Sequence, residues 1–325
     1  MATRVLVVGG AGYIGSVCAA VLKQAGVEVA TYDDLSTGHA EAAQGTLIRG
    51  DIRDRDRLTG VLKEGNFDAV MHFAAKSLVG ESVSNPLRYF DVNMGGTATL
   101  VQSMQDAGVH CLVFSSTCAI YGNPEYLPLD EDHPQNPVSP YGASKKMVEE
   151  MLAECREKED LRVTTLRYFN AAGCMPDGTL GESHATETHL IPLAIAAALG
   201  QRPPLSLFGD DYETRDGTCI RDYIHVLDLA DAHLKALNRL LEGDPGSAFN
   251  VGTGIGTTVR EVLESIDRCL GEPVPHSVAD RREGDPPALF ARADKIRDTL
   301  QWEPKWTNID DIVSTALQWA KSPAF

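Results

Sequence analysis

The feature that most constrains this chain is a regular alternation of strand-like and helix-like segments through its first half. Short apolar runs typical of buried strands lie at residues 5–8, 27–32, 46–48, 69–73, 111–115 and 163–167. The clearest segments with helical spacing lie between them, at residues 14–25, 87–107 and 140–156. Parallel strands need long crossovers, so this order predicts βαβ units and a doubly wound α/β sheet with helices on both faces.

The pattern changes near residue 170, where loops rich in Pro and Gly begin. Such loops with short elements are typical of a smaller domain that covers a ligand. Strand, helix and strand patterns then return at residues 221–226, 227–241 and 248–251. We therefore expect a first domain at residues 1–170, to which the chain returns at about 220–255. Most of 171–325 should form a smaller C-terminal α/β domain.

Composition excludes several classes of protein. The 46 Asp and Glu residues outnumber the 29 Lys and Arg residues, which gives a formal net charge of -17. This charge would repel a polyphosphate backbone, so nucleic acid is not an expected partner. No apolar run reaches the roughly 20 residues that a membrane span needs. The seven cysteines lack a C-x-x-C pair, and no signal peptide precedes residues 5–8, so we expect a cytoplasmic protein.

A glycine-rich segment joins the first predicted strand to the first predicted helix. Its sequence is Gly9-Gly10-Ala11-Gly12-Tyr13-Ile14-Gly15. Glycines at three-residue spacing let the backbone approach a pyrophosphate at a helix N-terminus, as in a Rossmann dinucleotide site. The next predicted strand leads into Asp33 and Asp34, where a carboxylate would accept the adenosine ribose hydroxyls and repel a 2′-phosphate. We predict NAD as the cofactor; a solvated turn is the alternative for the two aspartates.

A second group of residues points to proton transfer. Tyr141 and Lys145 lie one turn apart on one face of a predicted helix, so the ammonium group should favour the phenolate and lower the pKa of Tyr141. Ser115-Ser116-Thr117 closes a predicted buried strand at its carboxyl end, the edge where doubly wound sheets bind ligands. We predict Tyr141 as the general base, Lys145 as its partner and one of these three hydroxyl groups as the bridge between substrate and Tyr141. A strand-end cap is the alternative for these hydroxyl groups.

Taken together, these residues resemble the extended short-chain dehydrogenase/reductase family, and most closely its epimerases that act on UDP-hexoses. The resemblance spans nearly the whole chain. Its other segments are Asp51-Ile52-Arg53, His72-Phe73-Ala74-Ala75, Val79-Gly80-Glu81-Ser82, Arg167-Tyr168-Phe169-Asn170, Phe208-Gly209-Asp210-Asp211-Tyr212, Arg221-Asp222-Tyr223-Ile224-His225-Val226 and Arg281-Arg282-Glu283-Gly284-Asp285. The resemblance implies an NAD-dependent isomerase that interconverts UDP-galactose and UDP-glucose by transient oxidation at sugar C4. It also implies a homodimer, built from the helices at 87–107 and 140–156.

The resemblance assigns further residues to the two ligands. On the NAD side it adds Asp51, Ile52, Phe73, Ala74, Ala75, Asn93 and Tyr168, and it places Tyr141 and Lys145 at the nicotinamide end. On the UDP-sugar side it adds Asn170, His189, Leu190, Phe208, Arg221, Tyr223, Arg282, Asp285 and Leu289 to Thr117 and Tyr141. The two arginines would bind the pyrophosphate, so local cations overcome the global negative charge.

Individual roles follow from the same resemblance. Phe208 would support the uracil, and Asp285 would bind the uridine ribose. Leu289 would lie beside the C2 substituent of the sugar, where relatives restricted to glucose and galactose carry a bulky Tyr. Lys76 is a candidate for the cofactor phosphates. We find no cluster of His, Cys, Asp and Glu at metal-ligand spacing, and we predict no metal site.

Two other functions are compatible with this fold. A nucleotide-sugar dehydratase or decarboxylase would need an extra acid or base after the strand-end hydroxyl, whereas Cys118 and Ala119 follow Thr117. A non-catalytic NAD-sensing protein would have no reason to keep Tyr141, Lys145 and Thr117 together. The sequence therefore favours the epimerase.

Overall fold

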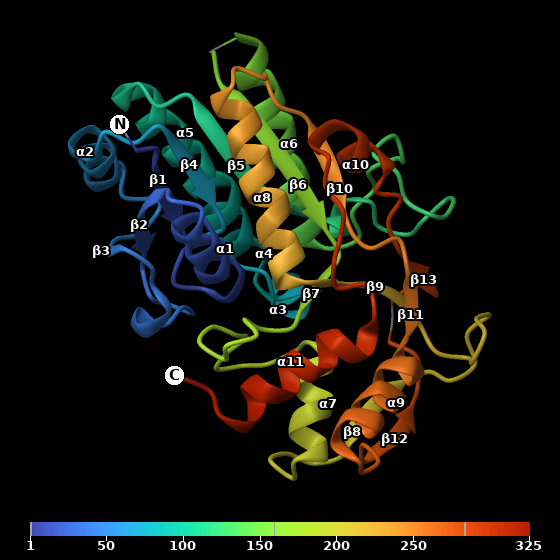
Figure 1. Cartoon of the computed structure of the whole chain (residues 1–325). Coiled ribbons are helices and arrows are strands. Elements are labelled where there is room, and N and C mark those ends of the chain that lie inside the picture. Colours follow the sequence, from blue (N-terminus) through green and yellow to red (C-terminus); the bar gives the residue numbers. More distant parts are fainter. Residues whose placement is uncertain (1, 159, 283) are drawn as a thin grey trace.

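A seven-stranded parallel sheet forms the larger part of the computed structural model, which describes residues 2–158, 160–282 and 284–325 (Figure 1). The strand order is β10-β6-β5-β4-β1-β2-β3, and every pairing is parallel. The carboxyl ends of these strands therefore lie at one edge of the sheet. The bounds are β1 Arg4–Val8, β2 Glu28–Asp33, β3 Thr46–Arg49, β4 Ala69–His72, β5 Cys111–Thr117, β6 Arg162–Tyr168 and β10 Ala248–Val251.

Helices cover both faces of this sheet, which confirms the predicted doubly wound fold. One face carries α1 Tyr13–Gln24, α8 Val226–Leu241 and α10 Asp294–Leu300, and the other carries α2 Arg55–Gly65, α5 Gly96–Ala107 and α6 Pro140–Lys158. In β1, Val5 and Val7 point into the first core, whereas Leu6 and Val8 point into the second. Strands buried on both faces read as continuous apolar runs, which explains why the sequence predicted them well.

The predicted helix at 87–107 is divided in the structure. After α3 Val79–Ser84, the chain forms α4 Pro86–Tyr89, a π-helical segment at Phe90–Gly95, and then α5. Such π-helical segments occur frequently at functional sites. This one carries Asn93, a candidate cofactor residue, with its side chain buried.

A smaller part of the molecule lies below the large sheet in Figure 1 and contains two small sheets. β7 Asn170–Ala172, β9 Ile220–His225, β11 Gly256–Thr258 and β13 Ala288–Leu289 form one, and β8 Leu205–Phe208 pairs with β12 His276–Ala279 in the other. Helices α7 Leu190–Ala198, α9 Val259–Leu270 and α11 Ile309–Lys321 share an apolar core with them. Single 3₁₀ turns lie at Ala40–Ala42 and Cys118–Ile120.

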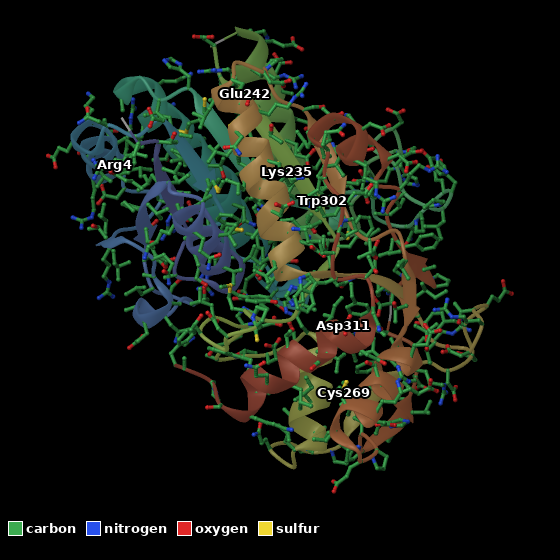
Figure 2. The ribbon with its side chains drawn as sticks, in the orientation of Figure 1. Arg4, Lys235, Glu242, Cys269, Trp302 and Asp311 are labelled. Carbon is green, nitrogen blue, oxygen red and sulfur yellow. The ribbon has the colours of Figure 1, made fainter. Side chains whose placement is uncertain are left out.

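The chain returns to the large sheet through α8 and β10. The strand predicted at 221–226 was expected to join the large sheet as part of this return. It instead forms β9, which pairs with β7, β11 and β13 of the small sheet. Trp302, labelled in Figure 2, is fully buried in the core under α8, and its indole N–H donates to the carbonyl oxygen of Asp228 (3.0 Å). No helix among the described residues has the length and apolar character that crossing a membrane requires.

A buried ion pair fixes α6 against the sheet. Arg167 of β6 and Glu149 of α6 approach to 2.6 Å, with side chains only 7% and 8% exposed. The Ser116 hydroxyl of β5 donates to the same carboxylate, and Arg167 also donates to the Tyr121 hydroxyl (3.0 Å). Every charged group in this network therefore has a partner, as buried charges require.

We predict that Glu149→Ala lowers the free energy of unfolding by about 3–5 kcal/mol, because it leaves Arg167 buried without a counter-charge. Glu150→Ala is the matched control, since Glu150 lies on the exposed face of the same helix and, among the described residues, forms its ion pair with Lys146 (3.7 Å). That control should change stability by less than about 0.5 kcal/mol. Urea unfolding of both variants tests this, and equal losses would show that the pair does not stabilise the fold.

Candidate active site

The glycine turn between β1 and α1 has the geometry of a dinucleotide site. Gly9 has φ +82°, and an added Cβ there would lie 2.3 Å from the Ala74 nitrogen. At Gly15 it would lie 2.2 Å from the Gly9 oxygen, so both positions need glycine for the strand and helix to pack. Gly12 begins the helix without a side-chain cap, and its Cβ position meets only the Gly9 oxygen at 3.5 Å. The open side at Gly12 therefore fits a pyrophosphate at the N-terminus of α1.

Asp33 holds this turn in place. Its two carboxylate oxygens accept backbone N–H groups from Ala11 (2.9 Å) and Leu35 (2.8 Å). Burial raises the pKa of Asp33, and these two hydrogen bonds oppose that rise. Asp34 is exposed and accepts the N–H of Ser36 (2.8 Å). Each oxygen of Asp33 keeps a further lone pair, so its predicted contact with the adenosine ribose stays a prediction.

The remaining candidates on the adenosine side lie near this turn. Phe73, Ala74 and Ala75 directly follow β4, and the N–H of Phe73 donates to the Val8 oxygen (2.7 Å). Asp51 lies beyond β3 and forms an ion pair with Arg53, which lowers the pKa of Asp51. Ile52, the next residue, is buried. The structure thus brings these residues to the edge of the sheet that carries the glycine turn.

Asn93 forms hydrogen bonds both to the segment after β4 and to α6. Its side-chain oxygen accepts the N–H of Lys76 (2.8 Å), and its Nδ2 donates to the Lys76 oxygen (3.0 Å) and to Ser144 Oγ of α6 (3.0 Å). The Lys76 ammonium group reaches Ser36 Oγ (3.2 Å) in the loop after β2. Asn93 is therefore a positioning residue for the segment after β4, and its predicted contact with NAD is not visible in these bonds.

Thr117 and Tyr141 come together at the carboxyl end of β5. Thr117 lies close enough to the Tyr141 hydroxyl to lower the pKa of that phenol, and Thr117 Oγ1 accepts the N–H of Ala119 (3.1 Å). Tyr168 lies opposite Thr117 on the neighbouring strand β6, and its hydroxyl is hydrogen-bonded to Ser115 Oγ. The predicted pair of reactive hydroxyls is therefore present in the fold, with Tyr168 next to it.

The predicted effect of Lys145 on Tyr141 stays a prediction for the protein with its cofactor bound. Without a cofactor, burial raises the pKa of Tyr141 to about 12, Thr117 opposes this rise, and Lys145 is not among the groups that shift it. The Lys145 ammonium instead donates to the Ser115 carbonyl oxygen (2.7 Å) and lies 4.7 Å from the Phe114 ring centroid. Burial lowers the pKa of Lys145 to about 7, with Glu149 opposing the shift. Burial favours the neutral form of both groups, which the helical spacing alone does not reveal.

Candidate residues for the second ligand form two contacting pairs. Arg221 of β9 donates to the carbonyl oxygens of Ile220 (2.8 Å) and Pro286 (2.9 Å) and lies 3.4 Å from Asp285. The guanidinium of Arg282 lies over the Phe208 ring, 4.5 Å from its centroid. These contacts position two cations close to one aromatic ring and one carboxylate, a set of groups that suits a nucleotide.

Leu289 connects this side to the reactive hydroxyls. It pairs with Arg221 across β13 and β9, and it packs with Cys118 against one small apolar cluster. Cys118 directly follows Thr117 in the chain. The structure therefore places Leu289 between Arg221 and the carboxyl end of β5, where Thr117 lies.

The other candidates occupy β7, β9 and the neighbouring loops. Asn170 and Tyr223 are partners across β7 and β9, and Asn170 Nδ2 donates to the Asp222 oxygen (3.0 Å). The Tyr13 hydroxyl donates to the Gly173 oxygen (2.6 Å), so α1 is tied to the chain after β7. Ile14, next to it, packs in the two cores around α1. Leu190 begins α7.

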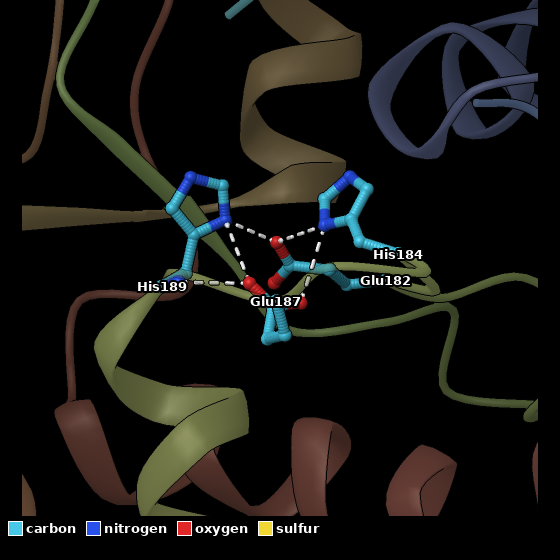
Figure 3. Close-up of side chains that lie close together, drawn as sticks. All are labelled: Glu182, His184, Glu187 and His189. Carbon is cyan, nitrogen blue, oxygen red and sulfur yellow. Dashed lines mark hydrogen bonds and ion pairs between the residues drawn. The ribbon is translucent and has the colours of Figure 1, made fainter. Parts of the chain in front are cut away.

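His189 lies in a group that the sequence analysis missed. Its Nδ1 is hydrogen-bonded to Glu182, and ligand atoms of Glu182, His184, Glu187 and His189 all lie within 4.8 Å of one another (Figure 3). The prediction that no His, Cys, Asp and Glu residues have metal-ligand spacing is therefore wrong. The pattern in the sequence that indicates this cluster is Glu-x-His-x-x-Glu-x-His over eight residues.

The chain belongs to the NAD dependent epimerase/dehydratase family, whose members match residues 5–252. It is 51% identical over 320 residues to the UDP-glucose 4-epimerase of Rhizobium leguminosarum bv. trifolii, covering 98% of each chain. The crystal structure of UDP-glucose 4-epimerase from Brucella ovis in complex with NAD is 47% identical, with a TM-score of 0.96 over 98% of this chain and 99% of that one. UDP-glucose-4-epimerase from Stenotrophomonas maltophila, with bound NAD and formylated UDP-arabinopyranose, is 39% identical, with a TM-score of 0.95 over 98% of each chain. The predicted family and its NAD dependence are confirmed.

We predict that Lys145 makes stability depend on pH in protein freed of nucleotide. The unfolded chain holds the lysine proton up to about its ordinary pKa of 10.5, whereas the folded chain releases it near pH 7. The unfolded state therefore binds more protons between these values, and stability rises with pH by up to about 1.4 kcal/mol per unit. Urea unfolding at pH 7 and pH 9 should show this gain in the wild type and its loss in Lys145→Met. Equal pH slopes for both proteins would contradict it.

Proposed function

We propose that this protein interconverts UDP-galactose and UDP-glucose by oxidising sugar C4 and reducing it again on the other face. The observation that carries the proposal is that Thr117 and Tyr141 come together at the carboxyl end of β5. This edge also holds the glycine turn on one side, and Leu289 leads from it to the cationic residues on the other. Relatives named UDP-glucose 4-epimerase that cover nearly the whole chain support the proposal.

Tyr141, Thr117 and Lys145 have separate roles in the reaction. NAD, when bound, supplies a hydride acceptor for C4, which later returns the hydride, and a positively charged ring that favours the phenolate of Tyr141. Tyr141 takes the proton of the 4-hydroxyl group, and Thr117 holds the same oxygen by a hydrogen bond. Lys145 binds the nicotinamide ribose. After the sugar turns, Tyr141 gives the proton back to the same oxygen, and because the hydride would also return to C4, no net oxidation occurs.

Inversion requires a sugar that can turn while its nucleotide stays fixed. Arg221 and Arg282 hold the pyrophosphate, since guanidinium groups bind phosphate oxygens bidentately. Phe208 supports the uracil and Asp285 the ribose. The sugar itself is held loosely, so the 4-keto intermediate rotates about its link to UDP and presents its other face.

Under the same proposal, the two parts of the chain bind different ligands. Residues 1–170, with the return through α8 and β10, bind NAD, and most of 171–325 bind the UDP-sugar.

The proposal also includes a homodimer in a reducing compartment. The homodimer is supported by exposed apolar side chains on or beside α3, α4 and α6: Val79, Val83, Leu87, Val138 and Met147. A reducing cytoplasm is supported by the seven cysteines, all of them among the described residues, which form no disulfide with one another.

One assay tests the function directly. Purified protein is incubated with UDP-galactose and no added cofactor, and the products are separated. UDP-glucose should form. A product that has lost water would support the dehydratase alternative, and no reaction even after NAD is added would contradict catalysis.

We predict that Tyr141→Phe keeps bound NAD and loses at least about 10²-fold in kcat, the scale of a positioned acid or base. The change removes only the hydroxyl group, which lies next to Thr117. Tyr126→Phe is a matched control, because the Tyr126 hydroxyl bonds to Asp130 in an exposed loop (2.6 Å). Near wild-type turnover of Tyr141→Phe would remove this residue from the mechanism.

We also predict that Leu289 limits the substituent at sugar C2. Its side chain is larger than Cys but lacks the ring of Tyr, so the wild type should act efficiently on UDP-galactose and at most weakly on UDP-N-acetylgalactosamine. Leu289→Cys should improve the second activity and Leu289→Tyr should abolish it. The measurement is the ratio of kcat/KM for the two substrates, and a ratio that neither substitution changes would show that Leu289 is not the gate.

A further inference from the structure

Four side chains converge in the loop between β7 and α7, apart from the reactive hydroxyls. Glu182, His184, Glu187 and His189 point toward a common centre at the start of α7 (Figure 3). Both imidazoles approach with Nδ1: His184 Nδ1 lies 3.3 Å from Glu182 Oε1 and 3.2 Å from Glu187 Oε2. His189 Nδ1 lies 3.6 Å from Glu187 Oε1 and is hydrogen-bonded to Glu182 Oε1. Two nitrogen and two oxygen donors thus surround one point.

The spacing of these atoms suits a compact site with four ligands. In a tetrahedral site the distance between two ligand atoms is about 1.6 times the metal–ligand distance. For Zn²⁺ bound by imidazole nitrogen and carboxylate oxygen, that gives about 3.3 to 3.6 Å. The distances from His184 Nδ1 to Glu182 Oε1 (3.3 Å) and to Glu187 Oε2 (3.2 Å) fall at or beside this range. One ligand atom from each of the four residues lies within 4.8 Å of the others, so small side-chain movements would bring all four to a bound ion.

The charges of the cluster also suit a cation. The side chain of Glu182 is only 6% exposed and that of Glu187 is 19% exposed, whereas that of His189 is 56% exposed. Within the described part of the chain, the two carboxylates form ion pairs with His184 and His189 and with no lysine or arginine. A divalent cation bound by the neutral imidazoles would supply, at one point, the two positive charges that otherwise come from the histidines.

The surrounding backbone already orients these ligands. Glu187 Oε1 accepts the N–H groups of Thr188 (2.6 Å) and His189 (2.8 Å), which turns Oε2 toward His184. The backbone of the loop is held from two sides: Trp319 Nε1 of α11 donates to the Glu182 oxygen (2.7 Å), and His39 Nε2 lies 3.2 Å from the Ser183 oxygen. Ligands fixed by such outer contacts bind metal at a smaller cost in conformational freedom.

We propose that Glu182, His184, Glu187 and His189 form a Zn²⁺ site. Two imidazoles favour zinc over the hard cations Mg²⁺ and Ca²⁺, which prefer oxygen ligands. Four protein ligands leave no open position, so the ion has a structural role rather than a catalytic one. It fastens the loop that reaches from β7 to α7, where His189 and Leu190 begin the helix. His189 is also one of the residues that the resemblance assigns to the UDP-sugar, so the ion would lie at the border of the proposed substrate site.

Metal binding and stability provide the test. The full-length protein is treated with a chelator, returned to buffer and titrated with Zn²⁺ in equilibrium dialysis with metal analysis. One ion per chain should bind, and Zn²⁺ should raise the thermal unfolding midpoint, because it binds the folded chain. Co²⁺ serves as a second probe, and it should give the strong visible bands of a four-coordinate site without thiolate charge-transfer bands.

Single substitutions separate this site from binding elsewhere. His184→Gln and Glu182→Gln, which keep size and hydrogen bonding, should each weaken Zn²⁺ binding at least about 10-fold, since even the loss of an outer contact costs that much. His276→Gln is the matched control: this imidazole is exposed on β12 and should leave the binding unchanged. Both glutamine variants should stay folded, as judged by circular dichroism without metal.

Three outcomes would overturn the proposal. These are binding of less than one ion per chain with no change in the unfolding midpoint, equal affinity in His184→Gln, Glu182→Gln and the wild type, and thiolate bands in the cobalt spectrum. In the first case the cluster is a network of histidine–glutamate ion pairs. In the other two, the ion binds elsewhere, with cysteine as the ligand in the last.

Discussion

The buried ion pair between Glu149 and Arg167 is the interaction on which the reactive centre depends. It joins α6 to β6, while Ser116 joins the same carboxylate to β5. Because Thr117 lies on β5 and Tyr141 on α6, this network sets the separation of the two hydroxyl groups. A charged pair in a medium of low polarity is costly to open, so the helix cannot slide along the sheet without losing it. Lys145 adds a second link, through the Ser115 carbonyl oxygen.

A second buried carboxylate ties the two parts of the molecule together. Asp222 of β9 is fully buried and accepts N–H groups from Thr253 (2.9 Å), Gly254 (3.0 Å) and Ala291 (3.1 Å), and also the Thr253 hydroxyl (2.7 Å). Thr253 and Gly254 follow β10 of the large sheet, and Ala291 follows β13. This carboxylate thus fixes Arg221, its neighbour in β9, relative to the sheet edge where Thr117 lies. Arg221, the candidate anchor for a nucleotide, and the reactive hydroxyl groups are therefore held at fixed positions relative to each other.

The sequence predicted those parts of the structure that follow from local pattern. Strands buried on both faces read as apolar runs, and a strand–glycine turn–helix order fixed the position of Gly9 and Gly15. It could not show contacts between segments that are distant in sequence: Lys145 bonds to the Ser115 carbonyl oxygen of β5, which helical spacing does not reveal. The four side chains of the loop before α7 were missed although Glu-x-His-x-x-Glu-x-His is visible in the sequence, because that loop has no periodicity and the spacing alone does not show that the side chains converge.

The central claim is that hydrogen leaves sugar C4 as a hydride and returns to the same carbon within one site. UDP-galactose carrying deuterium at C4 tests this most directly. After conversion by protein without added cofactor, mass spectrometry and NMR should find the deuterium at C4 of UDP-glucose, with none in the solvent. Loss of the label to water would mean that C4 exchanges a proton, and it would contradict the account.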